Sequence, residues 1–281
     1  MFDPRFLFAV SRPRFWLYIL GPYLVGLAAG ASVASELTSY AAIIFGIYFL
    51  FPANLLIYGV NDVYDFETDR VNPKKQDYEM LVRPDVHRSL LLTIAALNTP
   101  FVIAAYFLVP QALPSLVGLI FFSVFYSAPP NRAKAIPILE SIFNVLYVFP
   151  GAFAYQMLTG SFPPLMVFTA AALWTMAMHA YSAIPDIDAD RQAGVSTVAT
   201  LLGKNGTLLF CLAAWVGAAV LSFSYIGYLS VALGLVYTLL IAVSFFGSGR
   251  DRLFAVYRYF PLVNSVAGFI LFWYVAAKFL I

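Results

Sequence analysis

Long apolar runs separated by short polar stretches follow one another along the whole chain. A helix that crosses about 30 Å of hydrocarbon needs roughly 20 consecutive apolar residues, and most of the runs come close to that length. The pattern predicts nine membrane-spanning helices, at residues 15–34, 41–60, 88–108, 113–128, 138–158, 163–184, 206–224, 226–246 and 256–279. We therefore expect an all-α integral membrane protein in which residues 1–281 form one compact transmembrane domain.

Composition supports this class independently of the pattern. Hydrophobic residues make up 62% of the chain and charged residues only 11%, which lies well outside the range of ordinary globular domains. The single cysteine, Cys211, excludes an internal disulfide and is expected to pack within an apolar helix.

The basic residues are distributed unevenly between the polar stretches. With nine spans, the N-terminus and the loops after helices 2, 4, 6 and 8 lie on one side of the membrane. That side holds fifteen of the sixteen basic residues, all except Lys278. Because short cytoplasmic loops are enriched in Lys and Arg, this side is predicted to be cytoplasmic and the C-terminus to lie outside. The plasma membrane is the expected location.

An acidic stretch, "NDVYDFETDR", follows the second predicted helix at residues 61–70. Asp62, Asp65 and Asp69 are spaced three and four apart, so they project from one face if the helix continues. Asn61 stands beside them. Three like charges on one face repel each other, which costs stability unless a cationic group lies between them.

A second acidic stretch, "YSAIPDIDADRQAG", closes the sixth predicted helix at residues 181–194. Asp186 and Asp190 are four apart and share a face, whereas Asp188 is expected to point elsewhere. Pro185 is expected to break or kink the helix just before them. Both acidic stretches end even-numbered helices, so both are predicted to face the cytoplasm.

Carboxylate and amide oxygens, without clustered histidine or cysteine, indicate a hard cation, and Mg²⁺ fits best. Magnesium usually binds through one or two carboxylates together with substrate phosphates. Two acidic faces across a cavity would therefore form a metal–diphosphate clamp. The simpler alternative is that the acids only solvate helix ends. A transporter, in which acids line an ion path, is a further alternative, although such acids are expected near the bilayer midplane.

The motifs resemble those of a known family. "NDVYDFETD" followed far downstream by "DIDADRQAG" looks like the paired aspartate motifs of the UbiA superfamily of intramembrane prenyltransferases, and "YSAPPNRAK" at 126–134 lies between them. The resemblance covers nearly the whole chain. It implies nine helices around a central cavity, capped on the cytoplasmic side and open laterally to lipid.

The resemblance also implies the chemistry. Prenyl transfer from an allylic prenyl diphosphate to a lipophilic acceptor would depend on Mg²⁺, with Asp65, Asp69, Asp186 and Asp190 as the catalytic residues. The metal ligands would be Asn61, Asp62, Asp65, Asp69, Asp186 and Asp190. The diphosphate would be bound by Arg14, Lys74, Tyr126, Arg132, Lys134 and Tyr181. The tyrosines are equally well explained as an interfacial aromatic belt.

The acceptor is the least specified feature. "SRPRFWLYILGPYLVG" near the N-terminus resembles the lycopene elongase branch of the superfamily, which adds C5 units to carotenoid ends. An aromatic quinone precursor or a glycerol-phosphate lipid is the alternative acceptor. The expected partners are these substrates and the surrounding membrane lipid; neither nucleic acid nor an obligate protein partner is implied.

Overall fold

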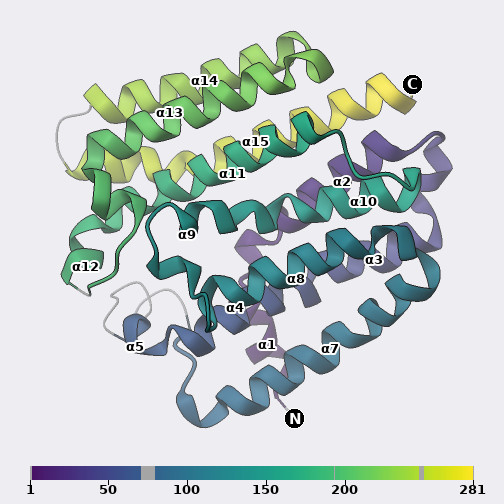
Figure 1. Ribbon diagram of the computed structural model, residues 1–281, viewed down its shortest axis with the longest axis horizontal. Coiled ribbons are helices and arrows are strands. Elements are labelled where there is room, and N and C mark those ends of the chain that lie inside the picture. Colours follow the sequence, from purple (N-terminus) through teal and green to yellow (C-terminus); the bar gives the residue numbers. More distant parts are fainter. Residues whose placement is uncertain (1, 71–79, 193, 247–249, 281) are drawn as a thin grey trace. The chain divides into compact units, whose positions relative to one another are not determined.

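The computed structural model describes residues 2–70, 80–192, 194–246 and 250–280, and the regular elements in these ranges are all helices (Figure 1). The chain divides into two compact units. Unit 1 comprises Met1–Arg132, Phe149–Phe162 and Ala276–Ile281, and unit 2 comprises Ala133–Val148 and Pro163–Val275.

In the residues that the structure describes, unit 1 contains eight α-helices joined by short 3₁₀ turns. The α-helices are α1 (Pro4–Val10), α2 (Leu17–Gly30), α3 (Tyr40–Leu50), α4 (Pro52–Tyr64), α5 (Phe66–Asp69), α7 (His87–Leu108), α8 (Leu113–Ser127) and α10 (Phe149–Thr159). The 3₁₀ turns are η1 (Pro13–Phe15), η2 (Ala34–Thr38), η3 (Pro84–Val86) and η4 (Pro110–Ala112).

Helix α4 is the central helix of unit 1 and carries the first acidic motif at its end. It begins at Pro52, whose ring cannot continue the hydrogen bonding of α3, so the chain breaks at Phe51. Every residue from Pro52 to Val60 is buried, as expected for a helix that is apolar on all sides. It packs against α1, α3, α7 and α8, which fixes the position of Asn61 and the residues after it.

Helices α2 and α10 of unit 1 approach each other closely at two glycines. A Cβ atom on Gly26 would overlap the backbone carbonyl of Gly151, and one on Gly151 would lie 2.9 Å from the carbonyl oxygen of Pro22. Small residues at a helix crossing let backbones pack tightly inside a membrane. This contact therefore depends on the absence of side chains at both positions.

Unit 2 contains the longer helices of the second half of the chain. Its α-helices are α9 (Leu139–Ile142), α11 (Leu165–Ala183), α12 (Ile187–Gln192), α13 (Val198–Ile226), α14 (Tyr228–Phe246) and most of α15 (Arg250–Leu280). Its 3₁₀ turns are η5 (Ala133–Ala135), η6 (Phe143–Tyr147) and η7 (Ile184–Asp186).

The core of unit 2 is aromatic, and α11 lies alongside α13 in it (Figure 1). Trp215 of α13 packs on Tyr237 of α14, with ring centroids 4.6 Å apart, and Tyr181 packs on Phe260 at 4.8 Å. Rings at such distances add packing energy beyond their buried area. The contacts tie α11, α13, α14 and α15 together.

The described ranges contain seven helices long and apolar enough to cross a membrane, or eight if the broken pair Leu139–Tyr147 and Phe149–Thr159 is one span. The prediction of a multi-pass, all-helical membrane protein is confirmed, whereas the count of nine is not. The difference lies in the first predicted span, where α2 has 14 residues. At 1.5 Å per residue it rises only about 21 Å.

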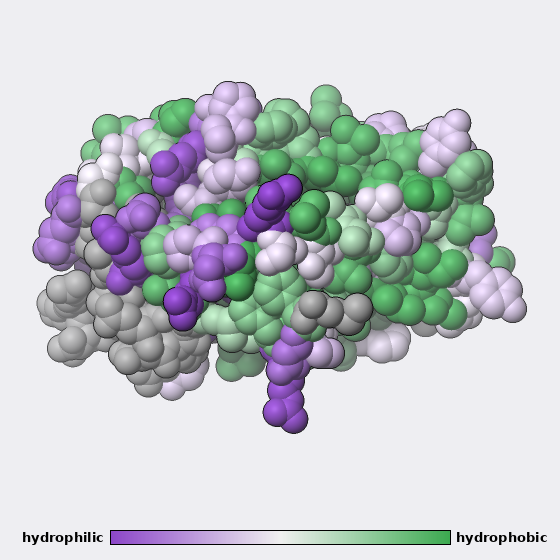
Figure 2. All heavy atoms as spheres, turned by 90° about the horizontal axis from the view of Figure 1, so that it is seen from below, coloured by the Kyte–Doolittle hydropathy of each residue, from purple (hydrophilic) through white to green (hydrophobic). Residues whose placement is uncertain are grey.

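Exposed apolar side chains are consistent with a lipid environment. On α7, Leu92 is 62% exposed, Ile103 51% and Phe107 74%. Figure 2 shows hydrophobic residues over much of one face, while strongly hydrophilic residues gather toward one end of it. A water-soluble monomer rarely exposes apolar surface on this scale, so these side chains are expected to contact lipid.

Substituting Gly26→Ala is expected to destabilise unit 1, because the new methyl group overlaps the backbone of Gly151. Overpacking of this kind costs about 1–3 kcal/mol, which should lower the thermal unfolding midpoint measured in detergent. The matched control is Gly21→Ala on the same helix, where an added Cβ meets no heavy atom within 4 Å. Equal midpoints for the two variants would contradict the proposed close contact.

Candidate functional site

The first acidic motif lies where α4 ends and the short helix α5 begins. The predicted shared face of Asp62, Asp65 and Asp69 required the helix to continue. This condition is not met, because α4 ends at Tyr64 and Asp65 has φ −105° and ψ 3°. The chain resumes helical bonding at once, with the amide of Asp69 donating to the carbonyl of Asp65 at 2.8 Å. Asp65 therefore occupies the break itself.

The carboxylate of Asp65 is held by two neighbouring side chains. The Asn61 amide donates to Asp65 Oδ2 and also to Ser127 Oγ, the latter at 2.9 Å. Ser127, at the end of α8, lies 3.5 Å from the same carboxylate oxygen. Asp65 is only 1% exposed and Ser127 also 1%. Sequence reasoning missed Ser127, although it lies inside the "YSAPPNRAK" stretch.

Asp62 has a cationic partner from the N-terminal segment. Arg12 Nη2 lies 2.6 Å from Asp62 Oδ1, and the two side chains are 15% and 3% exposed. Arg12 is thus a cation that offsets part of the repulsion expected between the aspartates of this motif. The sequence shows Arg12 only as one basic residue among sixteen, because no periodicity connects it with a residue 50 positions away.

The other candidate residues in unit 1 lie at its surface or partly buried. Arg14 is exposed and its guanidinium lies 4.5 Å from the ring centroid of Phe15. Tyr126 is half-buried at the end of α8, and Arg132 is exposed in a left-handed conformation with φ 40°. Lys74 falls outside the described residues. Contact of these side chains with a diphosphate stays a prediction.

The second acidic motif, in unit 2, forms as expected around Pro185. Helix α11 ends at Ala183, the turn η7 carries Pro185 and Asp186, and α12 follows. Asp186 and Asp190 are half-buried, whereas Asp188 between them is exposed. This difference in exposure agrees with the expectation that Asp188 points away from the other two.

A buried glutamate fixes the segment after the second motif. Glu140 of α9 is 1% exposed, and its Oε1 accepts a 2.7 Å hydrogen bond from the amide of Val198, the first residue of α13. Its Oε2 accepts from the amide of Ser141 at 3.0 Å. Both oxygens are thereby engaged, and a negative charge at a helix start is favourable. The sequence gives one signal for this buried residue, which is that Glu140 stands alone within an apolar run.

The remaining candidates of unit 2 differ in their surroundings. Lys134 is half-buried in η5. Tyr181 is 1% exposed, and its hydroxyl exchanges a 2.8 Å hydrogen bond with Ser244 on α14. This bond and the aromatic packing hold Tyr181 within the core of unit 2. Contact of Tyr181 with a diphosphate stays a prediction.

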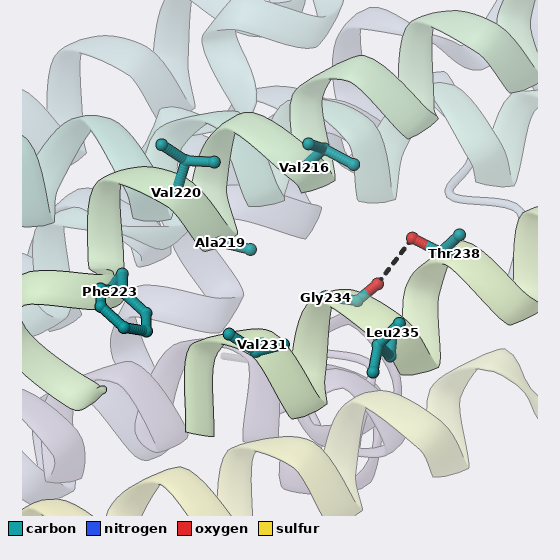
Figure 3. A pocket seen from close by; sticks show the side chains of 8 residues that line it. All are labelled: Val216, Ala219, Val220, Phe223, Val231, Gly234, Leu235 and Thr238. Carbon is teal, nitrogen blue, oxygen red and sulfur yellow. Dashed lines mark hydrogen bonds between the residues drawn. The ribbon is translucent and has the colours of Figure 1, made fainter. Parts of the chain in front are cut away.

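An apolar groove of about 390 Å³ lies between α13 and α14 (Figure 3). The hydroxyl of Thr238 donates to the carbonyl of Gly234 at 2.8 Å, so the one polar side chain of the lining is already engaged. The groove carries no charged group and is unsuited to a diphosphate or metal. Its lining residues are Val216, Ala219, Val220, Phe223, Val231, Gly234, Leu235 and Thr238.

Each unit thus gathers one acidic motif at the end of a helix, supported by buried polar neighbours. Such an arrangement can bind hard cations through oxygen ligands. Within the part of the chain that the structure describes, no three His, Cys, Asp or Glu side chains already form a metal-binding group. The convergence of the two motifs on one ligand stays a prediction.

The fold and the two acidic motifs define an intramembrane transferase, and comparison with known proteins gives its family. The model of the UbiA prenyltransferase family matches residues 19–259. The chain belongs to this family and is a prenyltransferase, as the sequence resemblance predicted.

Within the family, the chain lies with the lycopene elongase/hydratases. It is 41% identical to the lycopene elongase/hydratase of Haloferax volcanii, covering 95% of this chain and 87% of that one. It is 40% identical to the protein of that name from Halobacterium salinarum, covering 95% of both. A UbiA homolog from Archaeoglobus fulgidus, solved with GPP and Mg²⁺, has the same fold, with a TM-score of 0.70, 21% identity and 95% and 99% coverage.

Substituting Ser127→Ala is expected to lower prenyl-transfer activity by about tenfold, because a hydrogen bond to a charged group contributes about 1.5–3 kcal/mol and Asp65 would lose its orienting neighbour. Initial rates at saturating donor would measure the loss.

The matched control is Ser123→Ala, one turn earlier on α8. Ser123 is 2% exposed and its hydroxyl makes no hydrogen bond within the described residues. Its removal should leave the rate close to that of the parent. Similar losses in both variants would show that general packing of α8, rather than the orientation of Asp65, matters.

Proposed function

We propose that this protein transfers a C5 dimethylallyl group from dimethylallyl diphosphate to the end of a lycopene-like carotenoid. The observation that carries the proposal is the 41% identity to a lycopene elongase/hydratase over 95% of the chain. The acidic motifs and their buried supports supply the means to bind the diphosphate.

The bond changes balance without an oxidant or reductant. The allylic C–O bond breaks and pyrophosphate leaves with its electron pair. The π electrons of the terminal double bond of the acceptor then form the new C–C bond to the allylic carbon. The positive charge passes to the acceptor, which loses a proton to pyrophosphate or water, or takes up a water molecule and then releases a proton.

Asp65, Asp69, Asp186 and Asp190 are proposed to hold Mg²⁺, which when bound would neutralise the diphosphate and favour its departure. The donor set fits such an ion, because it consists of carboxylate oxygens and Asp65 is buried and oriented by Asn61 and Ser127. Asn61 and Asp62 were predicted as ligands as well. Their contacts with Asp65 and Arg12 favour supporting roles.

The departing diphosphate also needs cations outside the metal site. We assign this role to Arg14, Lys74, Arg132 and Lys134, with Tyr126 as a hydroxyl donor. Guanidinium and ammonium groups form strong charge-assisted hydrogen bonds with phosphate oxygens. Arg132 and Lys134 follow α8 in the chain, and Arg14 precedes α2.

The proposed function includes a topology. We propose nine membrane spans, with α2 counted as the first and the broken segment from α9 to α10 as the fifth. The acidic motifs then face the cytoplasm of a cell whose plasma membrane holds the protein, beneath a cytoplasmic cap. Both units together would form one catalytic domain.

Membranes containing the protein, given Mg²⁺, dimethylallyl diphosphate and lycopene, should yield carotenoids longer by one or two C5 units. Chromatography with mass spectrometry would identify the products. Parallel reactions should offer 4-hydroxybenzoate or a prenylated glycerol phosphate as the acceptor. Prenylation of one of these acceptors, with lycopene unchanged, would contradict the carotenoid as acceptor. The protein would still be a prenyltransferase.

The roles of the acids are tested by Asp65→Asn and Asp186→Asn. Each should lower the rate of prenyl transfer by about two orders of magnitude or more, the scale for losing one electrostatic group that stabilises developing charge. Asp188→Asn is the matched control, because Asp188 lies in the same motif but is exposed. A comparable loss in the Asp188 variant would argue against the proposed assignment of ligands.

A further inference from the structure

Arg12 has an unusual backbone conformation. It has φ 50° and ψ 71°, in the left-handed region, between α1 and the turn η1. Few non-glycine residues adopt this region. Pro13 follows and fixes the start of η1. The side chain of Arg12 lies beside the end of α4.

The guanidinium of Arg12 is bound on two sides by residues of α4. One terminal nitrogen lies 2.6 Å from Asp62 Oδ1, and the guanidinium carbon lies 4.9 Å from the ring centroid of Tyr58, one turn earlier. A cation over an aromatic ring gains further electrostatic attraction. Tyr58 is 7% exposed and Asp62 3%, so water screens these interactions weakly.

We infer that Arg12 is a positioning residue that neutralises Asp62 and thereby sets how tightly the first acidic motif binds its metal ion. Asp62 forms an ion pair with Arg12, which lies between α1 and η1. Because the positive charge of Arg12 offsets the negative charge of Asp62, this carboxylate attracts an incoming cation less than an unpaired one would. This inference rests on the proposed function, because it assumes that the motif binds a divalent ion.

Two simpler roles for Arg12 predict different behaviour. If Arg12 only stabilises the fold, its removal lowers thermal stability and leaves metal affinity unchanged. If Arg12 contacts the diphosphate directly, its removal weakens donor binding and again leaves the affinity for metal alone unchanged. A positioning role changes the affinity for metal in the absence of donor, since Coulomb interactions with a doubly charged ion depend on every nearby charge.

The experiment measures Mn²⁺ binding by electron paramagnetic resonance on the full-length protein in nanodiscs, without donor. Arg12→Gln should tighten Mn²⁺ binding by about fivefold, because one positive charge is removed beside the acidic motif. Asp62→Asn should weaken binding by a similar factor, since Arg12 is then uncompensated. The double variant, with neutral side chains at both positions, should return to the parent affinity, and Arg12→Lys should stay close to it.

Unchanged affinity in both single variants would overturn the inference, as would a change of the same sign in both. Because Arg12→Gln could fail to fold, the opposite shift expected of Asp62→Asn and the recovery in the double variant each test the inference separately.

A thermal-stability cycle in EDTA distinguishes failure of this inference from failure of the proposed function. Removing one partner of a buried ion pair leaves the other charge uncompensated. Arg12→Gln and Asp62→Asn should therefore each lower the unfolding midpoint, and the double variant should lose less than the sum of the two. Additive losses in the unfolding midpoint would overturn the pairing of Arg12 with Asp62, independently of the result for metal binding. Absence of Mn²⁺ binding in the parent would instead overturn the proposed metal site, and with it the tuning by Arg12.

Discussion

Carboxylates inside an apolar protein must be paired or hydrogen-bonded, and this constraint organises the structure around the acidic motifs. A buried charge without compensation shifts its protonation or destabilises the fold. Asp62 is matched by Arg12, Asp65 by Asn61 and Ser127, and Glu140 by two backbone amides. Arg12, Ser127 and Val198 are distant in sequence from the acids they bind. Asn61 and Ser141 are near in the chain to the acids they bind. The supports therefore determine how the ends of the helices are held, and an enzyme that handles a diphosphate at a membrane surface needs those ends fixed.

Much of this could be predicted from the sequence because it depends on local pattern. Apolar runs of membrane-spanning length identify the helices, and the spacing of the aspartates identifies the two motifs. Pro185 was expected to interrupt the sixth helix, and η7 begins at Ile184 just before it. The exposure of Asp188 also follows from helical periodicity. The family resemblance rested on the order of three motifs along the chain, at residues 61–69, 126–134 and 186–194. The match of the family model to residues 19–259 confirms it.

What the sequence could not provide depends on contacts between distant residues. Arg12 and Asp62 are 50 residues apart, Asn61 and Ser127 are 66, and Glu140 and Val198 are 58; no periodicity relates such pairs. The break at Asp65 was missed because helical spacing on both sides of it is preserved, so the pattern of acids is the same for one helix or two. The first span was overestimated because apolar composition continues beyond the ends of α2, where η1 and η2 replace the α-helix. Tyr181 was chosen for its place at a helix end, which does not reveal that Ser244 engages its hydroxyl.

The central claim is that the acids of both units hold metal ions on one diphosphate. The most direct test is an experimental structure of the full-length protein with Mg²⁺ and a dimethylallyl thiolodiphosphate, whose bridging sulfur slows cleavage. The account predicts metal density bound on one side by Asp65 or Asp69, on the other by Asp186 or Asp190, with the diphosphate oxygens between them. A diphosphate held by only one of the two motifs, with the other directed away and free of metal, would contradict it.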